Sequence, residues 1–218
     1  MKQILLAMFV FLAIAFAGLG QTNYQEGLKN ATAELQKAKS VKDFEKLAVQ
    51  FEKLATQPNA DWLAPYYAAF CNAKIGWLYQ NDGDRIEPYA DKAEKQIQNA
   101  LTFLDSTSQK TEISEVYAVL SMINRSRVFI SPMTYGRKYG PAAMQYYQQA
   151  QKINPANPRA NWLDGWEKFS APKMFGGDKV KAKQILENAL AQWNNEKPKT
   201  NYPHWGKDEI EDLLHQLR

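Results

Sequence analysis

The sequence predicts an all-α fold, an α-α superhelix of about four helical hairpins with a C-terminal capping helix. Two observations predict it: apolar residues recur at helical spacing without a convincing strand pattern, and one apolar stripe occurs four times. Within each stripe, the second residue follows the first by four positions and the third follows the second by three. Successive stripes begin 39 to 50 residues apart. The stripes are Leu47, Phe51, Leu54; Ala93, Ile97, Ala100; Ala143, Tyr147, Ala150; and Ala182, Leu186, Ala189.

These offsets place the three side chains of a stripe on one face of a helix, and alanine there lets a neighbouring helix approach closely. A helix with one apolar face cannot bury that face alone. Repetition at such intervals is typical of a stack in which each hairpin covers the next. We therefore expect one helical-repeat domain over residues 21–218.

Caps and breaks place the first four helices. Ser40, with Asp43 three residues later, predicts the capped start of the second helix. Residues 81–84 form a break, and Pro88 is expected in the first turn of the fourth helix. The expected ranges are about 24–39, 40–57, 61–79 and 88–105.

The second half of the chain predicts five more helices. Thr111 opens the first of them, and the Gly140-Pro141 pair begins the next. Asn157 and Asp178 each precede a further helix as its cap. Residues 202–206 are expected to plug the open end of the stack before the last helix covers it. The expected ranges are about 111–130, 140–154, 157–170, 178–197 and 207–217.

The sixth helix and the turn after it carry a family resemblance. Ala143, Tyr147 and Ala150, followed by Pro155, reproduce the second-helix half of a tetratricopeptide repeat (TPR). Trp162 and Gly165 are similar to part of the first-helix half. The chain therefore resembles a divergent TPR protein, although its repeat spacing exceeds the 34 residues of the standard repeat. This resemblance implies a non-enzymatic scaffold that binds a protein or peptide partner.

A second resemblance lies in the turn Phe175-Gly176-Gly177-Asp178. It is similar to a turn in TPR-like subunits associated with bacterial TRAP transporters. That resemblance implies the alternative function, a small-molecule-binding accessory protein of an envelope transport system. The turn is expected to be structural, because its glycines allow backbone conformations that other residues cannot adopt and Asp178 caps the next helix.

The N-terminus has the pattern of a secretory signal peptide. Lys2 precedes an uncharged apolar run, and small residues end it at Gly18-Leu19-Gly20. We expect cleavage after Gly20, with cleavage after Ala17 as the alternative. The mature protein is then periplasmic or secreted, without a stable membrane anchor.

Composition argues against several kinds of function. The 27 basic and 23 acidic side chains are interspersed, which does not favour nucleic acid as a partner. The single cysteine, Cys71, precludes an internal disulfide and is expected in a helix interior. His204 and His215 are the only histidines and lack metal-ligand spacing. With no recognised catalytic motif either, we expect no enzyme activity, no cofactor and no metal site.

Two loops with the same order of residue types predict a binding edge. Residues 131–136 and 170–176 each contain Pro, Met, an aromatic residue and Gly, in that order. Equivalent loops of a hairpin stack lie on one edge, so Tyr135 and Phe175 are expected to be close. Their side chains either plug gaps between hairpins or form a ligand-binding rim. The nearby basic residues Arg125, Arg127, Arg137 and Lys138 either bind a carboxylate or an acidic peptide end, or are simply solvated. The candidate partner-binding residues are Arg125, Met133, Tyr135, Arg137, Tyr139, Met174 and Phe175.

Overall fold

The computed structural model describes residues 23–218, which form helices joined by turns. Within this range the chain contains no strand, so the predicted all-α class is confirmed. The first helix covers residues 23–35 of the described chain. The helices that follow are α2 (Val41–Ala55), α3 (Leu63–Leu78), α4 (Glu87–Thr102), α5 (Lys110–Ile130), α6 (Gly136–Ile153), α7 (Pro158–Ser170), α8 (Lys179–Asn195) and α9 (Lys207–Gln216), with short 3-10 turns η1 (Gly83–Arg85) and η2 (Lys173–Phe175).

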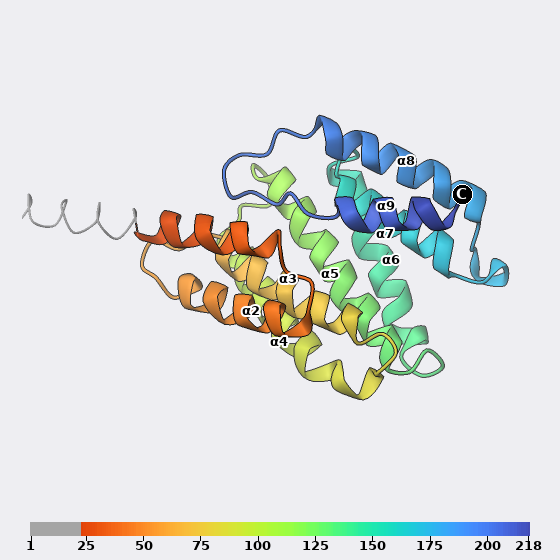
Figure 1. Ribbon diagram of the computed structural model, residues 1–218, viewed down its shortest axis with the longest axis horizontal. Helices are drawn as coiled ribbons and strands as arrows, with labels where there is room; N and C mark the ends of the chain where they lie inside the picture. The colour runs from red at the N-terminus through yellow and green to blue at the C-terminus, as the bar shows by residue number, and fades with distance from the viewer. Residues whose placement is uncertain (1–22) are drawn as a thin grey trace, which may run out of the picture.

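Consecutive helices pair into hairpins, and the hairpins stack (Figure 1). The pairs are α3 with α4, α5 with α6, and α7 with α8, while the first helix lies along α2, with Gly27 facing Leu54. Helices α3, α5 and α7 contact one another in succession and form the inner layer. Helix α9 packs against α7 and α8. This arrangement agrees with the expected four hairpins and capping helix.

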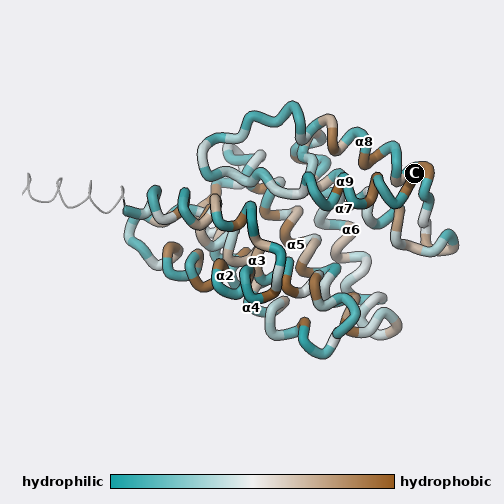
Figure 2. Tube along the Cα trace, viewed as in Figure 1, coloured by the Kyte–Doolittle hydropathy of each residue, from teal (hydrophilic) through white to brown (hydrophobic). Residues whose placement is uncertain are grey.

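All twelve residues of the four predicted stripes are buried. Hydrophobic and hydrophilic residues alternate along the peripheral helices, as Figure 2 shows for α2 and α8. Close approach at the alanines is visible in two hydrogen bonds from α5 to α6. Ser114 Oγ donates to the Ala150 carbonyl at 2.9 Å, and Ser121 Oγ donates to the Ala143 carbonyl at 2.8 Å. The stripes therefore form the contact surfaces between helices, as the spacing predicts.

Three of the predicted helix caps are present. The Ser40 and Asp43 side chains bond each other's backbone N–H groups in a capping box at the start of α2. Asn157 caps α7, and Asp178 Oδ1 accepts from the Lys181 amide at 3.0 Å at the start of α8. These caps fix where the hairpins turn, and so position the loops between them.

The predicted start of the sixth helix is wrong by about one turn. Helix α6 begins at Gly136, and Pro141 lies inside it. The Ser131 carbonyl accepts from the Tyr135 amide at 2.7 Å, and the Tyr135 carbonyl accepts from the Tyr139 amide at 2.8 Å. The turn after α5 thus leads directly into α6. Its hydrogen bonds outweigh the preference of proline for the first helical position.

The predicted signal peptide, residues 1–20, lies outside the described residues. Among residues 23–218, no helix combines the length and the apolar character that crossing a membrane requires.

Candidate ligand-binding site

The segment that follows α8 lies on the inner layer of the helix stack. The Tyr67 hydroxyl of α3 donates to the Asn201 carbonyl at 2.9 Å, and the Trp205 indole donates to the Tyr66 hydroxyl at 2.9 Å. Beyond it, Lys74 of α3 pairs with Glu209 of α9 at 2.5 Å. Residues 202–206 therefore lie on the inner face against α3, rather than at the open end of the stack where the sequence predicts them. A peptide at this part of the inner face would first have to displace the chain's own segment.

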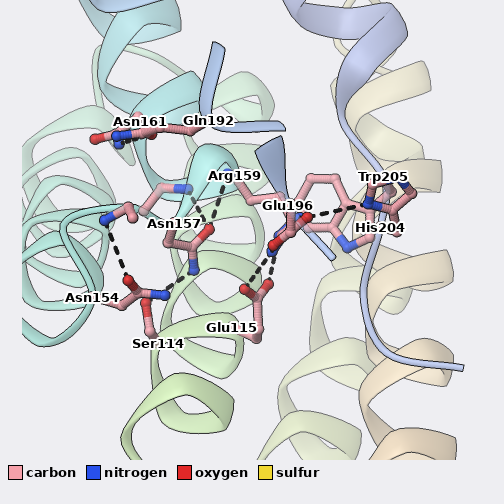
Figure 3. Close-up of polar contacts among 12 residues, drawn as sticks. Ser114, Glu115, Asn154, Asn157, Arg159, Asn161, Gln192, Glu196, His204 and Trp205 are labelled. Atoms are coloured by element: carbon pink, nitrogen blue, oxygen red, sulfur yellow. Dashed lines mark hydrogen bonds and ion pairs between the residues drawn. The ribbon is translucent and has the colours of Figure 1, made fainter. Parts of the chain in front are cut away.

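A buried ionic network holds this segment in place (Figure 3). Arg159 of α7 donates to both carboxylate oxygens of Glu115 of α5, with Nε···Oε2 and Nη2···Oε1 both at 2.7 Å. The same guanidinium donates to Glu196, directly after α8, at 2.8 and 2.6 Å. The ring of His204 lies 3.1 Å from Glu196 through Nδ1 and stacks on Trp193. The network thus joins α5, α7 and the C-terminal segment in the interior.

The electrostatics of this network follow from burial and pairing. Burial raises the pKa of Glu115, and Arg159 offsets only part of that effect. Burial alone would lower the pKa of Arg159, but the two carboxylates raise it above its ordinary value. Burial would likewise raise the pKa of Glu196, yet the bonds from Arg159 and His204 leave it lowered. The network is accordingly a structural clamp, with its donors and acceptors directed at one another.

A cluster of aromatic rings lies on the inner layer, and we call it the inner aromatic patch: Trp77, Phe129, Trp162 and Trp166. Trp77 of α3 is central, with ring centroids 4.9 Å from Trp166, 5.2 Å from Trp162 and 5.7 Å from Phe129. Its indole N–H donates to the Met122 carbonyl at 2.9 Å, which fixes the ring. The patch therefore combines side chains from three successive inner helices.

Three of the four rings of the patch keep partial exposure to solvent. Trp162 is buried, but Trp77, Phe129 and Trp166 are only half-buried. Trp205 of the C-terminal segment contacts the patch at Trp162, its buried member. The three half-buried rings are tilted against one another and present both faces and edges. Such a surface suits an apolar ring ligand better than a polar one.

One basic side chain contacts the inner aromatic patch. The Arg125 guanidinium lies 5.4 Å from the Trp166 ring centre and pairs with Glu167. This cation is mostly buried and already neutralised. A ligand carboxylate beside Trp166 would compete with Glu167 for Arg125. Lys74, one helical turn before Trp77 on α3, contacts the Phe44 ring and Glu209 instead.

The two predicted loops lie at the same end of the molecule (Figure 1). Met133 is 85% exposed, Met174 83% and Phe175 73%. Side chains that plugged gaps between hairpins would be buried, so these three do not have that role. Tyr135 stacks on Tyr139 with ring centroids 5.4 Å apart. The predicted proximity of Tyr135 and Phe175 stays a prediction.

The predicted basic residues are divided among different surroundings. Arg127 is buried and pairs with Asp91 at 2.9 Å and Glu94 at 2.6 Å on α4. Arg137 is exposed and has no ion pair within the described chain. Of the seven candidate residues, only Arg125 touches the inner aromatic patch through a recorded ring contact.

The structure gives no support to metal chemistry in the region it describes. Residues 23–218 contain no group of three or more His, Cys, Asp or Glu side chains placed to hold a metal ion. The sequence around Asp82 forms the 3-10 turn η1, as expected for a break. Cys71 is buried, and burial raises the pKa of its thiol.

Sequence reasoning missed the inner aromatic patch as an assembly. It assigned Trp162 to the first-helix half of a TPR, but nothing linked it to Trp77, Phe129 or Trp166. The position of these residues in the repeat could have predicted the patch. Trp77 and Phe129 both lie in the last turn of an inner helix, before equivalent loops. Equivalent positions in stacked hairpins meet in space.

Comparison with known proteins gives one informative result. No protein-family model and no curated protein sequence matches the chain. Among solved structures, the chain is similar to the HusA haemophore from Porphyromonas gingivalis, with a TM-score of 0.77 and 26% sequence identity. The match covers 89% of this chain and 92% of that one.

Proposed function

We propose that this chain is an exported, non-enzymatic binding protein for a flat, mostly apolar tetrapyrrole of the haem class. The observation that carries the proposal is the trio of half-buried rings, Trp77, Phe129 and Trp166, on the inner layer. The similarity to a haemophore over most of both chains supports it. Export accords with the predicted signal peptide. The small-molecule alternative from the sequence is thereby favoured over a protein-binding scaffold.

The chemistry of such a ligand matches the patch. A tetrapyrrole offers wide apolar faces and, in haem, two carboxylates at one edge. Burying about 200 Å² of apolar surface contributes roughly 5 kcal/mol, before the cost of association. Arg125 lies beside the Trp166 ring, where a ligand carboxylate would meet positive charge. Ring contacts thus supply affinity, and this cation supplies orientation.

No side chain of the inner aromatic patch, being Trp or Phe, can ligate haem iron. Haem iron is usually held by His, Cys, Met or Tyr side chains. Cys71 is buried, and His204 is engaged by Glu196 and Trp193. The thioethers of Met133 and Met174 are exposed, on loops at the end of the stack. The proposal therefore assigns most of the affinity to contacts with the macrocycle.

A fluorescence titration tests the ligand class. Ferric haem and metal-free protoporphyrin are added separately to residues 21–218, and quenching of the tryptophans is followed. Both compounds should quench to saturation, because the patch contains three tryptophans. A long-chain fatty acid, which is apolar and acidic but not flat, should not displace them. Displacement by the fatty acid, or absence of quenching by both rings, would contradict the proposal.

A TPR-like scaffold for a protein partner is the second candidate function. The stacked hairpins are consistent with a helical-repeat protein, but the C-terminal segment covers the inner face around Tyr66 and Tyr67. In this interpretation a protein partner binds the loop edge. Affinity capture with the native chain and a Tyr135→Ala, Arg137→Ala, Phe175→Ala variant tests that alternative. A protein retained only by the native chain would support it.

A further inference from the structure

We propose that the loop between α7 and α8, with the first turn of α8, docks the protein on an anionic lipid surface. We call this region, residues 168–183, the lysine-rich tip. Figure 1 shows the loop projecting at one end of the molecule. Met174 and Phe175 are exposed there, and Val180 is 72% exposed. Three large apolar side chains on one projecting segment are an unusual surface for a soluble domain.

The loop holds its apolar side chains outward through a defined backbone. The Phe175 amide donates to the Pro172 carbonyl at 2.9 Å, and Lys168 Nζ donates to the Gly176 carbonyl at 3.2 Å. Gly176 has a φ of 88°, which favours glycine. A Cβ at Gly177 would stand 1.8 Å from the Ala171 carbonyl oxygen. The backbone of this turn therefore holds Met174 and Phe175 in their exposed positions.

Positive charge surrounds these apolar side chains. The tip contains five lysines and one acidic residue, Asp178, which is occupied as the cap of α8. Within the described chain, the one ion pair made by these lysines joins Lys183 to Glu187 at 3.9 Å. Beside the tip is a hollow of about 340 Å³ with no acidic side chain in its lining. Its lining residues are Lys179, Val180, Lys183, Gln216, Leu217 and Arg218.

The residue types favour a lipid surface over a protein partner. Every cation of the tip is lysine, which is depleted in protein interfaces, where arginine is enriched. Lysine stems lie along apolar surface while their ammonium groups reach charged headgroups. A projecting turn with Met174 and Phe175 at its end suits shallow insertion between headgroups.

Vesicle co-sedimentation with residues 21–218 tests this proposal. The vesicles consist of phosphatidylcholine alone or with about one-third phosphatidylglycerol. The protein should bind the anionic vesicles at least about tenfold more tightly, and raising the salt concentration should weaken binding. A Met174→Ser, Phe175→Ser variant and a Lys173→Gln, Lys179→Gln, Lys183→Gln variant should each lose about tenfold in affinity. Circular dichroism should show unchanged helical content in both.

Matched controls come from α2 and the turn before it. Val49→Ser removes an exposed apolar side chain far from the tip in sequence, and Lys37→Gln, Lys42→Gln, Lys53→Gln removes the same charge from exposed positions. Both controls should bind like the native chain. Equal binding to neutral vesicles, equal losses in the controls, or a dimer disrupted by the tip variants without any vesicle binding would overturn the proposal. None of these outcomes depends on whether the chain binds haem.

Discussion

Arg159 of α7 and Glu115 of α5 form a two-bond ion pair in the protein interior. Both N···O distances are 2.7 Å, and the side chains are only 2% and 3% exposed. Because Arg159 also bonds Glu196, this pair connects the second and third inner helices of the stack to the C-terminal segment. One guanidinium therefore links α5, α7 and the segment that covers part of the inner face.

Removing that guanidinium should be costly. Arg159→Met leaves Glu115 buried without its partner, and loss of one member of a buried pair costs about 3–5 kcal/mol. Urea unfolding followed by circular dichroism measures the change in free energy of unfolding. The double variant Arg159→Met, Glu115→Leu should recover much of the loss, because it removes the uncompensated charge as well. A single-variant cost below about 1 kcal/mol would contradict the clamp.

The clamp also predicts a dependence of stability on pH. The pKa values of Glu196 and Glu209 are lowered below the ordinary 4.5 by Arg159 and Lys74, although burial opposes both shifts. A lowered pKa in the folded state stabilises the protein above pH 4.5, and this stability is lost as the pH falls through the folded value. Glu115 of the same clamp has a raised pKa, so its protonation acts in the opposite direction as the pH falls. The contribution of Glu196 is therefore measured as the difference in thermal stability between the native chain and Glu196→Gln. That difference should favour the native chain at pH 6 and shrink as the pH falls toward 3.

Gly165 should tolerate no larger residue. A Cβ there would stand 2.7 Å from Leu186, a buried stripe residue of α8, so Gly165→Ala should destabilise the protein by about 1–3 kcal/mol. Gly136→Ala is the matched control, because its Cβ would meet only Val128 at an ordinary 3.8 Å. Thermal unfolding of the two variants compares them. Equal melting temperatures would show that α7 and α8 can separate without cost.

The fold was predictable because its signals are local. The stripes at Ala93, Ala143 and Ala182 repeat a helical face, and the side chains of Asn157 and Asp178 mark helix starts within one turn. The start of α6 was not predictable, since Pro141 is typical of a helix start while the deciding hydrogen bonds belong to the preceding turn.

The site was predictable only in part. Each aromatic residue could be assigned to an apolar face, but the meeting of Trp77 with Trp166 depends on how the inner helices are rotated and offset, which is set by tertiary packing. The pair of Arg159 and Glu115 has no local signal, because isolated charges in helices are usually solvated. A repeated loop pattern in the sequence identified Met174 and Phe175, but it did not decide whether their side chains are buried or exposed.

The most direct test of the account is an absorbance titration of haem into residues 21–218, beside Trp166→Ala and Phe103→Ala. Phe103 is also a partly exposed aromatic residue, but it ends α4 rather than an inner helix. The account predicts saturable haem binding by the native chain, a loss of at least about tenfold in Trp166→Ala, and less than about twofold in Phe103→Ala. Native binding unchanged by Trp166→Ala, or no saturable binding at all, would contradict the inner aromatic patch as a haem site.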